Sequence, residues 1–322
     1  MLTAFSRDDV LRRLAERQVT VGALLIKPVT PSTLFDVCCT VLGLTMPSST
    51  RVSRREETLL AHQARLRGVH LLLAEDNPIN REVAVTLLSR AGIEVSVASD
   101  GQEALDMLDK QAFDGVLMDC QMPVMDGYAA TRALRKQRRW RDLPVIAMTA
   151  NAMVGDRDKA LAAGMNDHIA KPINVQQMFA TLARWIRPAS ESAATAGAPA
   201  ADDESQHDPL AGLVGIDSRS GVAAMMGDNA LYVRLLKMFR DREMDFTERF
   251  QAMRARGAGA AALRLAHDLK SVSGSLAMPA LHRAATDLER ACAEGAGDAD
   301  VEARVREVAY HLAPIIGQLR GL

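Results

Sequence analysis

The chain has 322 residues, of which 48% are hydrophobic, so it can form two or three ordinary domains at roughly 100 to 200 residues each. Its formal net charge of -1 gives no bias toward nucleic acid, and no apolar run reaches the length that crosses a membrane. The four cysteines lack metal-ligand spacing, and we expect a reduced, cytoplasmic chain.

Residues 1–46 contain a segment that is repeated near the middle of the chain. LLIKPVTPSTLF (24–35) and HIAKPINVQQMF (168–179) both place Phe eight residues after Lys. Each segment lies downstream of a Thr-Ala pair, which begins at Thr3 or at Thr149. The polar and basic residues 47–67 follow, and we interpret them as a linker with one helical turn or more.

Strand-like and helical runs alternate through residues 68–187. The predicted strands cover residues 69–74, 93–99, 114–119, 143–150 and 167–172. The predicted helices cover residues 80–92, 100–111, 127–137, 156–164 and 175–186. This alternation indicates an α/β fold with a doubly wound parallel sheet.

The last part of the chain has a different pattern. Residues 188–210 are rich in Ala, Ser, Pro and acidic side chains, a composition typical of a flexible linker. Residues 211–322 show only helical runs, which cover 230–256, 260–277, 280–294 and 301–319 and are separated by Gly or Pro. Four such runs with short loops predict an all-α, antiparallel four-helix bundle.

Polar side chains follow four of the five predicted strands. They are Glu75 and Asp76 after the first, Asp119 after the third, Thr149 after the fourth and Lys171 after the fifth. These ends meet at one rim of a parallel sheet, where ligands bind. Three carboxylates suit Mg²⁺, Thr149 and Lys171 suit phosphoryl oxygens, and Asp119 is the candidate nucleophile.

Other interpretations of this rim remain open. A single acidic residue at a strand end is often only a helix cap. An Asp-nucleophile phosphatase of the haloacid dehalogenase type needs a second Asp two residues after the nucleophile, where this chain has Gln121. A pure interaction module that binds partners without chemistry would not need the complete set of rim residues.

The segments LLLAEDNPINREV, VLMDCQMPVMDGY, IAMTAN and HIAKPI resemble the signature segments of receiver (response-regulator) domains. The resemblance covers residues 68–187 and implies a flavodoxin-like (βα)5 fold with Asp119 as phosphoacceptor. It also implies a Mg²⁺ site formed by Glu75, Asp76, Asp119 and the backbone carbonyl of Gln121. Thr149 and Lys171 match the switch hydroxyl and the phosphate-binding lysine. His168 stands where the family has its mobile aromatic residue.

His267 lies in the predicted helix 260–277, about 190° from the apolar stripe that includes Leu269. We therefore expect an exposed imidazole, with Lys270 and the small Ser271 on the same outward side. An exposed imidazole beside a cation fits phosphoryl acceptance. By contrast, His282 and His311 have no such setting, and we interpret both as surface residues.

LRLAHDLKSVSGSLAM resembles the phosphohistidine segment of histidine phosphotransfer (HPt) domains, with His267 as the phosphohistidine and Lys270 as its accompanying lysine. Ser271 stands where that family commonly has Gly. This resemblance implies that residues 211–322 are an HPt domain. Together the resemblances imply the C-terminal portion of a hybrid sensor histidine kinase that works in a two-component phosphorelay.

In such a relay, Asp119 would accept a phosphoryl group from a kinase histidine and pass it to His267. His267 would then donate it to the receiver of a downstream response regulator. The kinase core would belong to the same polypeptide or act in trans. The sequence has no ATP-binding motif, so we expect phosphotransfer but no autophosphorylation from ATP, and we expect any inner-membrane anchor to lie in the rest of a full-length parent.

The duplicated ending then fits the remnant of a first receiver. MLTAF and GALLIKP match its last two strands, with Thr3 and Lys27 in the places of Thr149 and Lys171. Residues 1–46 contain no match for the acidic pair or the phosphoacceptor. Two parallel strands cannot close a core alone, so we expect this remnant to be loosely packed or to borrow a partner surface.

Overall fold

The computed structural model describes residues 2–3, 25–26, 48–149, 154–187, 210 and 212–322. The chain divides into two compact units, Met1–Leu60 and Ala61–Leu322, and each is described by itself. In the first unit, β1 (Leu2–Thr3) pairs in parallel with β2 (Leu25–Ile26), where the sequence predicts the two strands of the remnant. Lys27 and the helices expected after each strand lie outside the described residues, so the remnant stays a prediction.

The predicted linker 47–67 is more regular than its composition suggested. It forms helix α3 (Ser48–Arg65), which has 18 residues. No Gly or Pro interrupts residues 48–67, so nothing in the segment stops a helix once it has begun. The other predicted linker, residues 188–210, lies almost wholly outside the described residues.

Five parallel strands form the sheet of the second unit in the order β4-β3-β5-β6-β7. Their bounds are β3 (His70–Ala74), β4 (Glu94–Ala98), β5 (Gly115–Asp119), β6 (Val145–Thr149) and β7 (Asp167–Ala170). Every residue of β5 and β6 is buried, as expected for strands covered on both faces. The predicted doubly wound sheet is confirmed.

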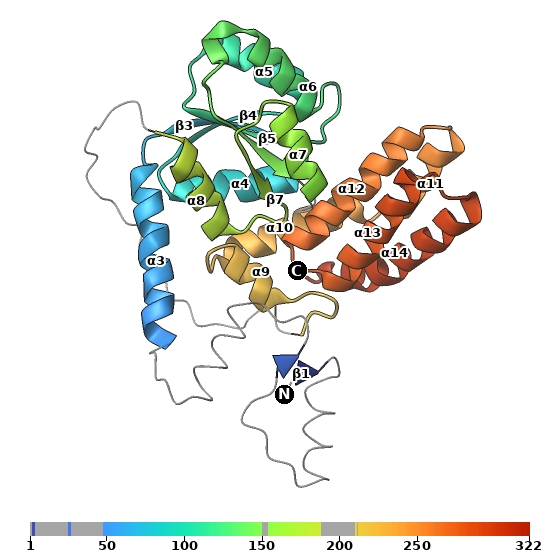
Figure 1. The fold of residues 1–322 in the computed structure, drawn as a ribbon. Helices are drawn as coiled ribbons and strands as arrows, with labels where there is room; N and C mark the ends of the chain where they lie inside the picture. The colour runs from blue at the N-terminus through green and yellow to red at the C-terminus, as the bar shows by residue number, and fades with distance from the viewer. Residues whose placement is uncertain (1, 4–24, 27–47, 150–153, 188–209, 211) are drawn as a thin grey trace. The chain divides into compact units, whose positions relative to one another are not determined.

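Helices cover both faces of this sheet. They are α4 (Pro78–Arg90), α5 (Gly101–Lys110), α6 (Gly127–Lys136), α7 (Val154–Ala162) and α8 (Val175–Trp185). In Figure 1, α5 and α6 lie on one side of the sheet and α4 and α8 on the other. Because the five strands are parallel, their carboxyl ends all lie at the same rim of the sheet. Asn77 caps α4 immediately after the first strand, because its side chain accepts the N–H groups of Ile79 and Asn80.

The C-terminal part is wholly helical over its described residues. Its helices are α9 (Ser218–Ala224), α10 (Asn229–Glu243), α11 (Phe246–Ala255), α12 (Gly259–Ser275), α13 (Pro279–Ala293) and α14 (Asp298–Leu319). The single run predicted over 230–256 is wrong, because the helix breaks between Glu243 and Phe246. The break contains no Gly or Pro, which is why the sequence pattern gave no sign of it.

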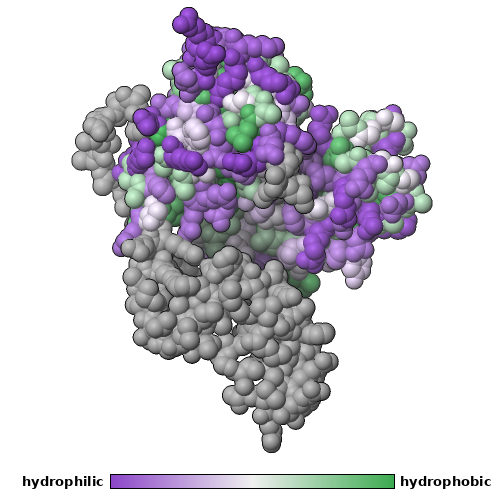
Figure 2. Space-filling model, in the orientation of Figure 1, coloured by the Kyte–Doolittle hydropathy of each residue, from purple (hydrophilic) through white to green (hydrophobic). Residues whose placement is uncertain are grey.

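Where Figure 2 shows the described residues, their surface is mainly hydrophilic with scattered apolar spots. The large apolar side chains exposed on the described residues are widely spaced along the chain, for example Val124, Val214 and Tyr310. Isolated exposed apolar residues are ordinary on protein surfaces. None of the described helices is both long and apolar enough to span a membrane.

Candidate phosphotransfer site

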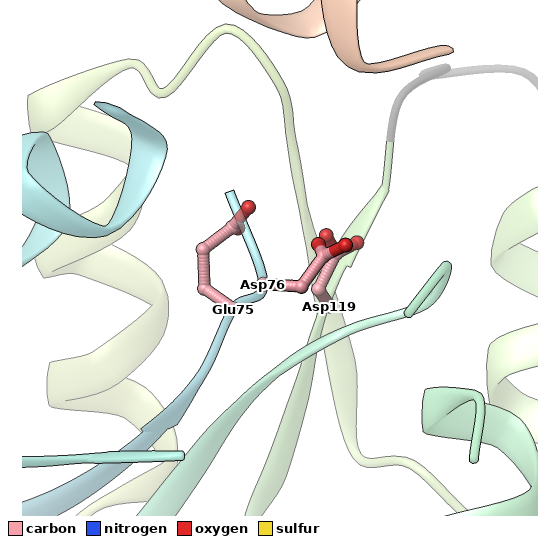
Figure 3. A group of neighbouring side chains, drawn as sticks. All are labelled: Glu75, Asp76 and Asp119. Carbon is pink, nitrogen blue, oxygen red and sulfur yellow. The ribbon is translucent and has the colours of Figure 1, made fainter. Parts of the chain in front are cut away.

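The three predicted carboxylates meet at the rim of the sheet. β3 ends at Ala74, which places Glu75 and Asp76 beside the end of β5, where Asp119 is the last residue. One carboxylate oxygen from each of the three residues lies within 4.8 Å of the others. Figure 3 shows the side chains of Asp76 and Asp119 converging from neighbouring strands. Hard oxygen ligands at this spacing fit a small divalent cation.

Lys171 joins two of these carboxylates. Its Nζ lies 2.7 Å from Glu75 Oε2 and 2.7 Å from Asp119 Oδ2, and the residue is only 7% exposed. Burial alone would lower the pKa of Lys171, but Asp119 and Glu75 outweigh it and raise the pKa above its usual value. Lys171 therefore stays charged, which provides a fixed cation beside Asp119. The Lys171–Pro172 peptide bond is cis.

Asp76 is the least buried of the three carboxylates. Burial, together with the negative charges of Asp268 and Asp119, raises its pKa to about 6. Asp268 follows His267 in helix α12, so the two chemical centres are close enough to influence each other electrostatically. A divalent cation would offset the crowding of negative charge.

The other predicted rim residues occupy distinct positions. Thr149 is buried at the end of β6, and its carbonyl accepts the backbone N–H of Lys171 at 2.7 Å. Gln121 is exposed, and its N–H donates to Asp119 Oδ1 at 3.2 Å, which leaves its role as a carbonyl ligand a prediction. His168 is half-buried in β7, with its Nδ1 3.6 Å from Asp167 Oδ1.

Gly127 lets the chain pass close to the backbone of Asp119. It is the first residue of α6, and its own N–H donates to the carbonyl of Cys120 at 3.3 Å. A Cβ atom at this position would lie 2.1 Å from the carbonyl oxygen of Asp119, which is far inside van der Waals contact. Only glycine fits here, and this explains the Asp-Gly pair of the motif.

The expectation that His267 is exposed is wrong. The residue is only 5% exposed, and Lys270 and Ser271 are also buried. Of the predicted apolar stripe, Leu269, Val272 and Leu276 are fully buried, whereas Leu265 is only half-buried. The opposite side of α12 is covered as well, by polar groups from other elements that helical periodicity alone could not reveal.

Glu289 in α13 provides part of this cover. Its Oε1 accepts a hydrogen bond from His267 Nδ1 at 2.6 Å, and its Oε2 accepts one from Lys270 Nζ at 2.8 Å. Burial tends to raise the pKa of Glu289, but the hydrogen bonds from His267 and Lys270 outweigh it and hold the pKa below its ordinary value. One carboxylate therefore orients both residues of the predicted HPt motif.

Glu289 was not predicted from the sequence. The one hint in the sequence was its position: Glu289 is a charged residue beside Leu288 and near Ala291, which both lie on the buried face of α13. Which helix that position faces depends on tertiary packing. His282, which we interpret from the sequence as a surface residue, is half-buried, and its Nδ1 donates to the carbonyl of Lys270 at 2.9 Å. His311 is half-buried and lies 3.1 Å from Glu307 Oε1.

Two protein families match the two parts of the second unit. Residues 71–183 match the response regulator receiver domain, and residues 234–321 match the Hpt domain. The chain combines a receiver domain with an Hpt domain. These are the domains of two-component phosphorelay signalling, so the receiver and Hpt resemblances drawn from the sequence are confirmed.

The relatives of the chain include histidine kinases. Histidine kinase 1 of Arabidopsis thaliana is 30% identical over 234 residues, which are 58% of this chain and 19% of the relative. BarA of Shigella flexneri, a signal transduction histidine-protein kinase, is 34% identical over 172 residues, which are 52% of this chain and 17% of the relative. The matches support identification of the chain as the C-terminal receiver-plus-Hpt portion of a hybrid histidine kinase, although it spans only about a fifth of these relatives.

Among solved structures, the chain is similar to the receiver domain of sensor histidine kinase PA1611 from Pseudomonas aeruginosa PAO1. That domain was crystallised with a magnesium ion coordinated in its active site cleft. The two sequences are 46% identical, the match covers 37% of this chain and 97% of the other, and the TM-score is 0.35.

Proposed function

We propose that Asp119 accepts a phosphoryl group from a kinase histidine and passes it to His267, which donates it to a downstream receiver. The observation that carries this proposal is the Asp119 carboxylate, which is bonded to Lys171 at 2.7 Å and grouped with Glu75 and Asp76. A nucleophile, a fixed cation and two further acidic ligands are the groups that phosphoryl transfer needs.

In the first step, an Asp119 oxygen attacks phosphorus, a P–O bond forms, and the P–N bond to the donor histidine breaks. Lys171 and Thr149 would hold the phosphoryl oxygens. Mg²⁺ would be held by Glu75, Asp76, Asp119 and the carbonyl of Gln121, and when bound it would neutralise charge on the phosphoryl oxygens.

In the second step, His267 Nε2 attacks the phosphorus of the aspartyl phosphate. A P–N bond forms, and the P–O bond to Asp119 breaks to leave the free carboxylate. The hydrogen bond to Glu289 keeps a proton on Nδ1, which leaves the lone pair on Nε2 for this attack. Lys270 offers positive charge to the arriving phosphoryl group.

The upstream kinase core, in the same polypeptide or in trans, and the downstream receiver are further parts of the proposal, as is a cytoplasmic location. An Asp-nucleophile phosphatase is a weaker alternative, because exposed Gln121 takes the place of the second Asp. The chain alone is expected to carry out phosphotransfer without ATP-dependent autophosphorylation.

The test uses the whole chain and radiolabelled acetyl phosphate with Mg²⁺. We expect base-labile label on Asp119, followed by base-stable label on His267. Asp119→Asn should lose both labels, while His267→Gln should keep the first and lose only the second. Chelation of Mg²⁺ should suppress labelling reversibly. Equal base-stable labelling of wild type and His267→Gln would contradict the proposed relay.

A further inference from the structure

One buried amide connects the receiver to the Hpt helix that carries His267. Asn80, in the first turn of α4, is only 4% exposed. Its Nδ2 donates to Ser271 Oγ at 2.9 Å and lies 3.3 Å from Glu75 Oε1. Its Oδ1 accepts from Ser275 Oγ at 3.4 Å. Asn80 thus contacts the acidic rim and two serines of α12 at the same time.

These serines lie close to the reacting histidine. Ser271 follows His267 by four residues and therefore lies on the same side of α12, one turn further along. Next along this helix, a Cβ atom on Gly274 would lie 3.5 Å from Pro172 Cδ, beside Lys171. Helix α12 thus contacts the receiver both at Asn80 and next to the phosphate-binding lysine.

Two ion pairs lie along the same contact. Arg90 of α4 pairs with Asp228, the N-cap residue of α10, and Glu82 of α4 pairs with Arg234 of α10. The arginine belongs to the receiver in the first pair and to the Hpt domain in the second. The paired positions are eight residues apart in α4 and six in α10, roughly 12 Å and 9 Å along the axes. As α4 runs from Glu82 to Arg90, its partners run backward, so the two helices are antiparallel.

This pattern gives selectivity more than strength. Exposed ion pairs contribute little to affinity, but like charges in the same places repel a wrong partner. The buried amide adds a second criterion, because a partner that leaves Asn80 or Ser271 without its hydrogen bond loses a buried interaction. Because the two ion pairs have opposite polarity, they also favour one relative direction of α4 and α10.

We propose that Asn80, Glu82 and Arg90 are specificity-determining residues of α4, which make the receiver surface selective for this chain's own Hpt domain through Ser271, Arg234 and Asp228. The proposal rests on the proposed transfer from Asp119 to His267. Asn80 and Ser271 are positioning residues, since they hold α12 over the rim and take no part in the bonds that form or break.

A charge-reversal cycle at Glu82 and Arg234 tests the proposal in the full chain. After acetyl phosphate labelling, the rate of transfer from Asp119 to His267 is followed. Glu82→Arg or Arg234→Glu alone should slow transfer by about 3- to 10-fold, because each places like charges together. The double variant should recover to within about twofold of the wild type. Asp109→Arg is the matched control, because Asp109 pairs with Arg139 inside the receiver, and its transfer rate should not change.

The amide is tested by a second cycle, with Asn80→Ala, Ser271→Ala and the double variant. The two single effects should not add, because both remove the same hydrogen bond. Additive effects, or a Glu82→Arg/Arg234→Glu variant that stays as slow as the slower single variant, would overturn the proposal.

Hydrogen exchange separates this inference from the proposed function. In the unphosphorylated chain, Arg234→Glu should raise amide exchange in α4, and the double variant should restore protection. If His267 of the wild-type chain never becomes labelled, the proposed relay fails, but the exchange rates in α4 still test whether the contact between α4 and the Hpt domain forms. If the relay works and α4 exchange is the same in all variants, the relay stands and the specificity proposal fails.

Discussion

His267 Nδ1 lies 2.6 Å from Glu289 Oε1, and this contact decides which ring nitrogen would be left to react in the proposed transfer. A histidine that donates one N–H to a carboxylate has a fixed tautomer and a fixed ring plane. Lys270 is held by the other oxygen of the same carboxylate. The pair is therefore oriented before any phosphoryl group arrives.

Replacing Glu289 should slow the second transfer without affecting the first. We expect Glu289→Ala to lower the rate of His267 labelling by about 10- to 100-fold, the range seen when an orienting partner is removed. Glu289→Gln keeps an acceptor for Nδ1 and should lose less. Nitrogen NMR of the imidazole provides the independent measurement, since only the alanine variant should show a mixed tautomer. An unchanged tautomer in Glu289→Ala would contradict the orienting role.

At the residue scale, the sequence predicted the polar residues at the rim of the sheet but not the groups that cover His267 and its neighbours. Glu75, Asp76, Asp119 and Lys171 were found because strand ends are local features, and parallel strands place them together. The hydrogen-bond partner of His267 is Glu289, which lies 22 residues later in the chain, and that of Ser271 is Asn80, which lies 191 residues earlier. Helical periodicity assigns sides to one helix and does not say what covers them.

Among the elements, the strands followed their sequence patterns closely and two helical segments did not. Buried parallel strands are continuous apolar runs, which stand out in a sequence. The break between α10 and α11 carries no Gly or Pro and is set by packing, since Phe246 and Phe250 are both fully buried just after it. Helix α3 forms in a segment whose polar composition suggested a linker.

The turn between β5 and α6 gives an element-scale prediction. Gly127→Ala should destabilise the receiver by at least about 2 kcal/mol, because the new methyl group would overlap the carbonyl of Asp119. Urea unfolding, followed by a probe in the receiver, measures this. Gly259→Ala, at the start of α12, is the control, since no atom lies within 4 Å of its Cβ position. It should be neutral or slightly stabilising, and equal losses in both variants would contradict the close-approach argument.

For the whole molecule, the contact between α4 and the Hpt helices implies transfer within one chain. The segment 188–210, predicted as a flexible linker, would keep the two domains at high local concentration without fixing them. The rate in wild type should then be independent of protein concentration.

A mixture of two defective chains tests this expectation. Asp119→Asn supplies an acceptor histidine without a donor, and His267→Gln supplies a donor without an acceptor. At micromolar concentration we expect base-stable label on the Asp119→Asn chain to form much more slowly than in wild type, and to speed up as concentration rises. Transfer in the mixture as fast as in wild type would show that the partners come from different chains.

The contact between the receiver and helix α12 has a consequence for the timing of transfer. Helix α12 presents one face, and the receiver of the same chain occupies it through Asn80 and Ser271. An outside receiver needs that face too, so it has to wait until the inside one departs. The lifetime of the contact between the receiver and the Hpt domain would then set a delay between arrival of the phosphoryl group on His267 and its release, and the contacts of α4 would determine the length of that delay.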